Sequence, residues 1–225
     1  MIDTLIVSGG NIQRDFALAF LKKTMEKSGK QNLRLLAADK GLEFFMDAGI
    51  VPDTAVGDFD SLSAEGKRFL KDSGNGKMEI LRLKPEKDDS DTQSAVNYAV
   101  GKGAKDIVIL GATGSRIDHV LANIGLLSMG KELGVRISLV DERNRISLIE
   151  SGTILKRNEQ FGDFVSFFPV GAEVSGLTLK GFKYPLSGYQ LRPSDSGLTV
   201  SNEIQEETAE VTFTEGTLLM IMSRD

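Results

Sequence analysis

The sequence predicts an α/β part, with a mostly parallel Rossmann-like sheet covered by helices on both faces, followed by an all-β sandwich. Up to residue 141, short apolar strand-like runs alternate with helix-like segments, which is the order typical of a parallel sheet. These runs lack polar alternation, as expected for strands buried on both faces. Beyond that point, short strand-like runs are separated by turn residues, which favours a β-sandwich. We therefore expect domains at 1–141 and 142–225.

In the first part, each expected strand is a short run that stops within two residues of Gly, Asp or Pro. The expected strands are Thr4–Val7, Leu33–Ala37, Thr54–Val56, Met78–Leu83, Ile107–Leu110 and Arg136–Val140. The helices expected between them are Ile12–Lys27, Leu42–Ala48, Ala64–Lys71, Ser90–Val100 and Asp118–Leu133. Ser90 followed by Gln93 resembles a capping box, so Ser90 is a candidate N-cap.

The second part shows short strand-like runs and no convincing helical pattern. The expected strands are Ile146–Ile149, Gly152–Leu155, Asp163–Phe168, Glu173–Leu179, Leu198–Val200, Ala209–Phe213 and Thr217–Met222. Gly, Pro, Asn and Ser between these runs supply the turns of an antiparallel sandwich or barrel.

The composition excludes several classes of function. The chain has no cysteine, which removes disulfides, zinc–thiolate sites and a cysteine nucleophile, and fits a reducing compartment. The formal net charge of -5, without a basic run, disfavours binding to a nucleic-acid backbone. The start lacks the features of a signal peptide, and no run of about 18 apolar residues predicts a membrane span. We expect a cytoplasmic protein that binds neither nucleic acid nor membrane.

Polar and glycine-rich loops follow the expected parallel strands. The carboxyl ends of parallel strands meet at one edge of the sheet, where ligands bind in open α/β folds. The loops at this edge are Ser8-Gly9-Gly10-Asn11, Asp39, Gly57-Asp58-Phe59-Asp60-Ser61, the stretch 86–91 and the stretch 111–118. The sequence therefore gathers its chemically useful residues on one rim.

The rim is rich in aspartate. Its acidic residues include Asp39, Asp58, Asp60, Asp88, Asp89 and Asp91. Clustered carboxylates repel one another unless a positive charge sits between them, and Mg²⁺ prefers such oxygen ligands together with substrate phosphates. Zinc and copper are disfavoured, because the only histidine is His119. Asp58 and Asp60 are the strongest candidates, whereas Asp88 and Asp89 could equally be solvated or cap a helix.

The loop from Gly111 to Gly114 precedes an expected helix and is a candidate phosphate cradle. Arg116 could clamp a phosphate, or it could form a structural ion pair with Asp118. His119 fits a structural role better than that of a base. The chain has neither a Walker A motif nor a dinucleotide fingerprint. These residues together predict Mg²⁺-dependent phosphoryl chemistry from ATP onto a small acceptor.

The order and spacing of these motifs resemble the thiamine pyrophosphokinase family of the bacterial type. The motifs are Ala38-Asp39-Lys40-Gly41, Pro52-Asp53, Gly57-Asp58-Phe59-Asp60-Ser61, Lys87-Asp88-Asp89-Ser90-Asp91-Thr92, the stretch 111–119, Gly181-Phe182-Lys183-Tyr184-Pro185-Leu186 and Ser201-Asn202-Glu203. Two departures are mild: the family often has Gly where this chain has Lys40, and Thr where it has Ser90.

The resemblance implies that pyrophosphate passes from ATP to the hydroxyl of thiamine, giving thiamine diphosphate and AMP. It also implies a homodimer with active sites at the subunit interface, an N-terminal ATP- and Mg²⁺-binding domain, and a C-terminal domain for thiamine binding and dimerisation. By resemblance the metal ligands are Asp58, Asp60 and Asp91, which act in catalysis with Arg116 and Asp118. The nucleotide-side residues are Gly9, Gly10, Asn11, Asp39, Gly111, Thr113, Gly114 and Arg116. The thiamine-side residues are Lys87, Asp118, Ser201 and Asn202, and Tyr184 is either an aromatic wall or a core residue.

Two other functions fit the same residues. The aspartates could serve a metal-dependent phosphohydrolase that acts on a nucleotide or a phosphorylated metabolite. The α/β part could instead be a non-catalytic nucleotide-binding module whose β part binds a protein partner. The products formed from ATP and thiamine separate these three hypotheses.

Overall fold

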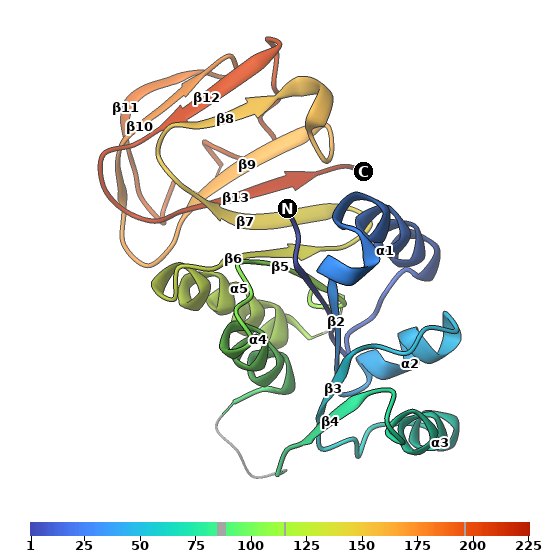
Figure 1. The fold of residues 1–225 in the computed structure, drawn as a ribbon. Coiled ribbons are helices and arrows are strands. Elements are labelled where there is room, and N and C mark those ends of the chain that lie inside the picture. Colours follow the sequence, from blue (N-terminus) through green and yellow to red (C-terminus); the bar gives the residue numbers. More distant parts are fainter. Residues whose placement is uncertain (85–88, 115, 196) are drawn as a thin grey trace. The chain divides into compact units, whose positions relative to one another are not determined.

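The computed structural model describes residues 1–84, 89–114, 116–195 and 197–225 (Figure 1). The chain divides into two compact units, Met1–Glu142 and Arg143–Asp225. The domain boundary predicted from the sequence lies between residues 141 and 142. Across the described parts of the chain, every helix is too short or too polar to cross a membrane.

The first unit is built on parallel strands in the order β4-β3-β2-β1-β5-β6. The strands are β1 (Thr4–Val7), β2 (Arg34–Ala38), β3 (Thr54–Gly57), β4 (Glu79–Arg82), β5 (Asp106–Leu110) and β6 (Arg136–Val140). The chain runs outward from β1 to β4, then returns to β5 beside β1 and runs the other way. The strand order therefore reverses between β1 and β5, which is where open α/β sheets bind ligands.

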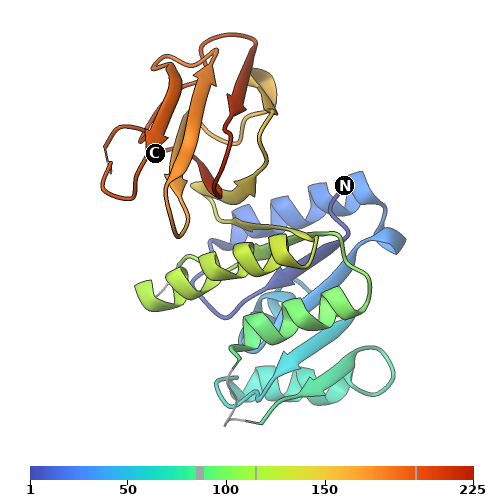
Figure 2. The same ribbon diagram turned by 90° about the vertical axis from the view of Figure 1, so that its left-hand side faces the viewer.

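Helices cover both faces of this sheet, as Figures 1 and 2 show. On one face lie α1 (Arg14–Ser28), α2 (Gly41–Asp47) and α3 (Ala64–Ser73), and the short 3₁₀ helix η1 (Lys30–Asn32) follows α1. On the other face lie α4 (Asp91–Gly101) and α5 (Ile117–Glu132). Except for the edge strand β4, the strands between them are almost entirely buried, which explains their largely apolar character. The predicted α/β architecture is confirmed.

Side-chain caps determine where several of these helices begin. The Ser63 hydroxyl accepts a hydrogen bond from the backbone N–H of Gly66 at 3.1 Å, at the start of α3. The Ser90 hydroxyl accepts one from the N–H of Gln93 at 3.1 Å, at the start of α4. Each cap satisfies a backbone donor that the first helical turn leaves without a partner. The predicted N-cap role of Ser90 is confirmed.

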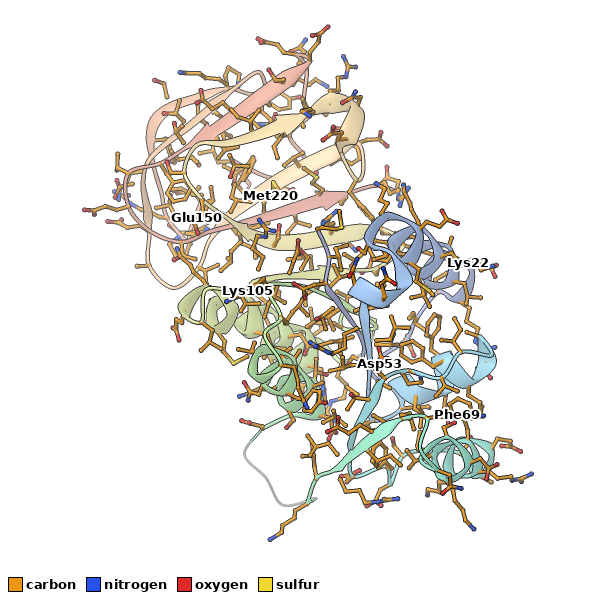
Figure 3. All side chains as sticks on the ribbon, in the orientation of Figure 1. Lys22, Asp53, Phe69, Lys105, Glu150 and Met220 are labelled. Carbon is orange, nitrogen blue, oxygen red and sulfur yellow. The ribbon has the colours of Figure 1, made fainter. Side chains whose placement is uncertain are left out.

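Asp53 holds the amino-terminal edge of the sheet together (labelled in Figure 3). Its carboxylate Oδ2 accepts a hydrogen bond from the N–H of Leu35 at 2.7 Å. Its own N–H donates to the carbonyl of Leu35 at 2.9 Å, and its carbonyl accepts from the N–H of Glu79 at 2.9 Å. Asp53 therefore fixes the register of β2, β3 and β4 at the edge opposite the carboxyl-end rim.

The second unit consists of antiparallel strands in two groups, β7-β13-β9 and β11-β10-β12-β8. The strands are β7 (Asn144–Ile149), β8 (Thr153–Lys156), β9 (Phe164–Pro169), β10 (Val174–Lys180), β11 (Leu186–Leu191), β12 (Thr208–Thr212) and β13 (Leu218–Ser223). A 3₁₀ turn, η2 (Arg157–Glu159), follows β8. The predicted β-sandwich is confirmed.

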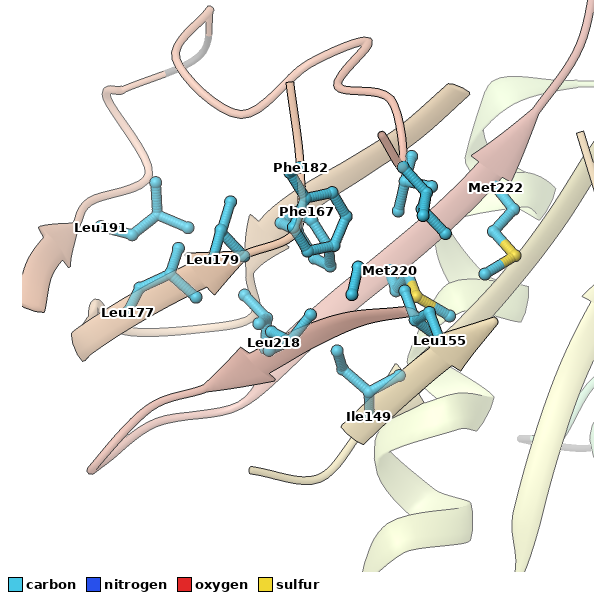
Figure 4. Close-up of a cluster of buried hydrophobic side chains, with 14 of the residues drawn as sticks. Ile149, Leu155, Phe167, Leu177, Leu179, Phe182, Leu191, Leu218, Met220 and Met222 are labelled. Carbon is cyan, nitrogen blue, oxygen red and sulfur yellow. The ribbon is translucent and has the colours of Figure 1, made fainter. Parts of the chain in front are cut away.

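Apolar side chains from both groups of strands form the core of this sandwich (Figure 4). Phe167 on β9, Leu177 on β10 and Leu218 on β13 are completely buried. The rings of Phe167 and Phe182 meet edge to face, with their centroids 5.7 Å apart. Burial of each such side chain contributes about 1.5–3 kcal/mol, so this cluster supplies much of the unit's stability.

In the second unit, one predicted strand is absent and one strand was not predicted. Residues 198–200 are not a strand: Leu198 and Val200 are exposed, while the polar Thr199 is buried and bonded to the backbone of Phe167. Strand β11 was missed because Ser187-Gly188 looks like a turn. Gly188 has a φ of 61° in a strand whose pairing with β10 is irregular, so this glycine marks a bulge rather than an end.

Two glycines of α5 test how tightly this helix packs on β6. A Cβ at Gly130 would lie 2.7 Å from Ile137 Cγ1 and 2.9 Å from the carbonyl oxygen of Val135, whereas a Cβ at Gly125 meets open space. We expect Gly130→Ala to lower the free energy of unfolding by about 1–3 kcal/mol through overpacking. Gly125→Ala should raise it by up to about 1 kcal/mol, because alanine favours helix. Urea unfolding measures both, and equal stabilities would contradict the close packing.

Candidate active site

The loops after β1 and β5 lie against each other at the point where the strand order reverses. The N–H of Gly10 donates to the carbonyl of Gly111, and the N–H of Asn11 donates to the carbonyl of Gly114, both at 3.0 Å. A Cβ at Gly111 would lie 2.6 Å from the carbonyl oxygen of Ser8, and one at Gly114 would lie 2.4 Å from that of Asn11. Both glycines are therefore required by contact between the loops, and the amides of Gly10 and Asn11 are already engaged.

Side chains hold the loop after β5 from two further directions. The hydroxyl of Thr113 donates to Asp141 Oδ2 at 2.5 Å. The buried amide of Asn123, on α5, donates to the carbonyl of Ala112 at 2.8 Å. This candidate phosphate loop is thus fixed before any ligand arrives, which lowers the entropic cost of binding.

Asp39, at the end of β2, has one carboxylate oxygen without a partner. Ser61 donates its hydroxyl hydrogen to Asp39 Oδ2 at 2.5 Å, whereas Oδ1 is buried and has no hydrogen-bond partner among the described residues. An unsatisfied buried acceptor costs about 1–3 kcal/mol. Asp39 also has a φ of 45°, which is uncommon for a residue other than glycine. A cation or a donor from a ligand would satisfy this oxygen.

The loop after β3 presents Asp58 and Asp60 on either side of a buried ring. Phe59 is 2% exposed, has a φ of 65°, and carries the guanidinium of Arg82 at 5.5 Å from its ring centroid. Asp58 is half-buried and Asp60 is exposed. The N–H of Asp60 donates to Asp58 Oδ1 at 3.0 Å, and Lys67 Nζ donates to the carbonyl of Asp60 at 3.2 Å. Burial of Phe59 therefore anchors the loop that carries both carboxylates at the carboxyl end of β3.

The start of α4 brings Asp91 to the same edge. Asp91 occupies the first turn, after the Ser90 cap. Asp89 accepts hydrogen bonds from Gln93 Nε2 at 2.7 Å and from Asn97 Nδ2 at 3.2 Å. Asp89 thus stabilises its own helix, the structural alternative that the sequence left open. The predicted thiamine-side residue Lys87 and the acidic residue Asp88 lie outside the described residues.

The chemistry of these donors suits a hard divalent cation. Within the ranges that the structure describes, no three His, Cys, Asp or Glu side chains converge into a complete metal site. Asp58, Asp60 and Asp91 therefore do not form a closed cage by themselves. Mg²⁺ characteristically takes only one or two carboxylates and completes its shell with waters and substrate phosphates. The unpartnered oxygen of Asp39 and the all-oxygen donor set fit such an open site.

Arg116 and Asp118 form an exposed ion pair at the start of α5. Arg116 Nε donates to Asp118 Oδ1 at 3.1 Å, and Nη2 donates to Oδ2 at 2.5 Å. The hydrogen bond from Arg116 holds the pKa of Asp118 below its usual value, with a smaller contribution from the N–H of His119. The same hydrogen bond raises the pKa of Arg116. Asp118 is therefore ionised at neutral pH, and the Nη1 group of Arg116 takes no part in this pair.

A cavity of about 190 Å³ opens beside the loop after β1. Its lining includes Gly9, Gly10, Asn11, Arg14, Lys40 and Glu43. Three of the predicted nucleotide-side residues thus share one hollow with a lysine and an arginine. Arg14 is paired with Asp47, so Lys40 is the more available of the two positive charges. The cavity is smaller than most ligand sites and suits one portion of a ligand.

Ser201 and Asn202 differ sharply in exposure within the second unit. Asn202 is 2% exposed: its Oδ1 accepts from the N–H groups of Tyr184 and Glu203, and its Nδ2 donates to the carbonyl of Tyr184 at 2.8 Å. Ser201 is exposed, with a φ of 55° and its N–H bonded to Ser166 Oγ at 2.9 Å. The Asn202 amide is thus buried beneath the surface and shapes it, whereas Ser201 is open to a ligand.

Tyr184 stands out from the same surface. It is 56% exposed, so the alternative that it packs in the core is wrong. Lys183 Nζ lies 5.6 Å from the centroid of its ring and bonds Glu203 Oε1 at 2.7 Å. The hydrogen bond to Glu203 raises the pKa of Lys183. The backbone of Tyr184 is therefore held by Asn202, and its ring is flanked by a paired lysine.

Sequence reasoning missed the hydroxyl and amide groups that support these loops. Ser8 bonds Thr92 at 2.6 Å across 84 positions of the chain, and neither residue was assigned a role. Asn123 was likewise taken only as part of a helix. Apolar periodicity cannot reveal such residues, because a single buried hydroxyl or amide looks like a solvated one. A sequence signal for Thr92 and Asn123 does exist: each is a polar residue at a helix position whose neighbours on the same face are apolar.

Two family models match the chain. One, described as thiamin pyrophosphokinase, catalytic domain, matches residues 25–139. The other, described as thiamin pyrophosphokinase, vitamin B1 binding domain, matches residues 152–218. Together they cover most of both units.

Similar proteins carry the same description. The chain is similar to thiamine pyrophosphokinase of Bacillus subtilis, with 35% identity over 190 residues that cover 84% of this chain and 87% of the relative. The crystal structure of thiamine pyrophosphokinase from B. subtilis superposes with a TM-score of 0.86 at 32% identity, over 99% of each chain. That of thiamin pyrophosphokinase from Geobacillus thermodenitrificans gives 0.80 at 30% identity, over 99% of this chain and 97% of that one.

The support that Asn202 gives can be measured without substrate. Asn202→Ala removes three hydrogen bonds from a buried position, so we expect unfolding free energy to fall by about 1–3 kcal/mol. Asn158→Ala, at an exposed position of the same unit, should change it by less than about 0.5 kcal/mol. Denaturant unfolding compares the stabilities of the two variants. An unfolding midpoint of Asn202→Ala equal to that of the wild type would show that the amide does not stabilise the fold.

Proposed function

We propose a site and a mechanism for this chain, which belongs to the thiamine pyrophosphokinase family. As a thiamine diphosphokinase, it transfers pyrophosphate from ATP to thiamine in the biosynthesis of thiamine diphosphate. The family uses a divalent metal ion, and for this chain we propose Mg²⁺, because the available ligands are oxygen atoms. ATP is a cytoplasmic substrate, and we place the activity in the cytoplasm.

The observation that carries the proposal is the unpartnered Oδ1 of Asp39. Ser61 links this carboxylate to the loop that bears Asp58 and Asp60. A buried carboxylate oxygen without a partner, in a residue hydrogen-bonded to the loop that carries two further aspartates, favours a positive charge nearby. We assign Asp58, Asp60 and Asp91 as the residues that hold Mg²⁺, with Asp39 supporting them. When bound, the ion neutralises charge on the β- and γ-phosphates of ATP.

We assign the nucleotide to the loops after β1 and β5. The residues on this side are Gly9, Gly10, Asn11, Gly111, Thr113 and Gly114. Because the N–H groups of Gly10 and Asn11 bond the neighbouring loop, these two residues would contribute shape rather than amide donors. The loops are held rigidly, so their contribution to catalysis is the positioning of the phosphates for in-line attack.

Arg116 and Asp118 would serve the two substrates at the point of transfer. The planar guanidinium of Arg116 suits a phosphate and would offset the charge that develops there. Asp118 is ionised at neutral pH and can accept a hydrogen bond from the hydroxyl of thiamine, orienting its oxygen toward phosphorus. A negative carboxylate also favours the positively charged thiazolium ring. Both side chains of the pair are exposed, so donors on Arg116 and acceptor positions on Asp118 remain open to the substrates.

For the thiamine side we propose Lys87, Asp118 and the exposed Ser201, with Asn202 shaping the surface and Tyr184 offering its ring.

We propose that residues 1–141 form the catalytic domain and residues 142–225 the thiamine-binding and dimerisation domain. We further propose a homodimer whose active sites lie at the subunit interface, as the family resemblance implies. Sedimentation at several concentrations tests this, and a monomer throughout would contradict it.

Phosphorus NMR with Mg²⁺, ATP and thiamine tests the reaction. We expect AMP and thiamine diphosphate in equal amounts. A metal-dependent phosphohydrolase would release inorganic phosphate without thiamine, although membership of this family does not favour that alternative. ADP with thiamine monophosphate would contradict pyrophosphate transfer, and unchanged ATP would indicate a non-catalytic module.

Substitution of the rim carboxylates tests the metal assignment. We expect Asp58→Asn and Asp60→Asn each to lower the turnover rate by at least about 100-fold, the scale of a lost electrostatic contact to the transition state. Folding should be nearly unchanged. Asp72→Asn, at an exposed aspartate of α3, is the matched control and should retain wild-type turnover. Near wild-type rates in both rim variants would overturn the assignment.

A further inference from the structure

A buried pair of hydroxyl groups joins the start of α4 to the end of β1. Ser8 Oγ and Thr92 Oγ1 lie 2.6 Å apart, and either can be the donor. Ser8 is 9% exposed and Thr92 is 7% exposed, so water does not readily replace the bond. A hydrogen bond is directional, whereas the apolar contacts of Ala95 and Val96 are not. The hydroxyl pair can therefore set the rotation and height of the first turn of α4.

The Ser8 end of this bond is rigid. The N–H of Ser8 donates to the carbonyl of Leu110 at 2.8 Å, which ties it to β5. On one side, a Cβ at Gly41 would lie 3.2 Å from the nitrogen of Ser8. On the other, a Cβ at Gly111 would lie 2.6 Å from its carbonyl oxygen. Ser8 is thus enclosed by neighbouring backbone, and its hydroxyl is a fixed reference point on the rim.

The Thr92 end adjoins Asp91. Consecutive residues of an α-helix point about 100° apart, so fixing Thr92 against the sheet also fixes the direction in which Asp91 leaves the helix. Two further sets of contacts at this end, the Ser90 cap and the bonds of Asp89 to Gln93 and Asn97, lie within α4 and the residues just before it. Those contacts shape the helix end, whereas the bond to Ser8 connects it to the sheet.

We propose that Ser8 and Thr92 are positioning residues that hold Asp91 at the rim in the orientation needed to bind the metal–nucleotide complex. The inference rests on the proposed role of Asp91 and extends it to two residues that do not touch substrate. Groups that orient a metal ligand typically affect metal affinity by about 10–100-fold.

The same helix provides a matched control at its other end. Thr54 Oγ1, on β3, donates to Tyr98 Oη at 3.4 Å, and Tyr98 Oη donates to Glu79 Oε2 at 2.6 Å. Thr54 is 2% exposed and lies at the amino-terminal edge of the sheet, away from the rim. Thr54→Val therefore removes a buried hydroxyl that ties α4 to the sheet without disturbing the start of the helix.

The test measures the affinity for Mn²⁺ with a non-hydrolysable ATP analogue by electron paramagnetic resonance, alongside urea unfolding and the KM and kcat of the full reaction. Ser8→Ala and Thr92→Val should each weaken binding by about tenfold or more, and the double variant should be no weaker than either single variant. Thr92→Ser, which keeps the hydroxyl, should bind like wild type. Thr54→Val should lower the unfolding midpoint and leave binding unchanged.

Three results would overturn the inference: unchanged binding in Ser8→Ala, additive losses in the double variant, or equal losses of binding in Thr54→Val. If Thr92→Val does not fold, Ser8→Ala and Thr92→Ser carry the comparison. The variant Asp91→Asn tests the role of Asp91 as a metal ligand separately from the positioning role of Ser8 and Thr92. Normal binding by Asp91→Asn would contradict the proposed metal ligand, whereas weak binding by Asp91→Asn with normal binding by Ser8→Ala would contradict only the positioning role.

Discussion

Direct contact between backbones at the carboxyl ends of the central strands is the constraint on which the rest of this site depends. A Cβ at Gly41 would lie 1.9 Å from the carbonyl oxygen of Val7, and Gly111 and Gly114 meet Ser8 and Asn11 almost as closely. The loops after β2 and β5 can therefore rest on the end of β1 only where glycine leaves room. Because these contacts involve main chain, the rim is stiff before any side chain contributes.

That stiffness allows the side chains on the rim to be held in unfavourable states. Asp39 and Phe59 both have positive φ, and the carboxylate of Asp39 has an oxygen without a partner among the described residues. Such strain persists only where the surrounding structure determines the conformation. The burial of Phe59 and the bond from Ser61 to Asp39 supply this determination. Packing around Phe59 and Ser61 thus holds the Asp39 carboxylate in a position where a cation or a ligand donor can satisfy its unpartnered oxygen.

Much of this arrangement could be predicted from the sequence, because apolar period and turn residues report on strands and helices directly. The bounds of β1 and β6 were predicted to the residue, and the strand-end rule brought Asp39, Asp58 and Asp91 to one edge. The same rules failed at Leu198–Val200, where the apolar side chains face outward, and at β11, where a glycine bulge resembles a turn. They also could not show that Asn202 is buried or that Ser8 meets Thr92, since these depend on contacts far apart in the chain.

The two ends of β3 show that a family signature mixes two kinds of information. Asp53 and Asp58 belong to motifs five positions apart, yet one precedes the strand and the other follows it. The carboxylate and both backbone polar groups of Asp53 form hydrogen bonds to Leu35 and Glu79, which belong to or adjoin β2 and β4. Anyone transferring active-site labels along such a signature would mark both aspartates as catalytic. The direction of the strand distinguishes the two aspartates. An acidic residue that precedes a parallel strand is placed to support the fold, whereas one that follows the strand is placed at the edge where ligands bind.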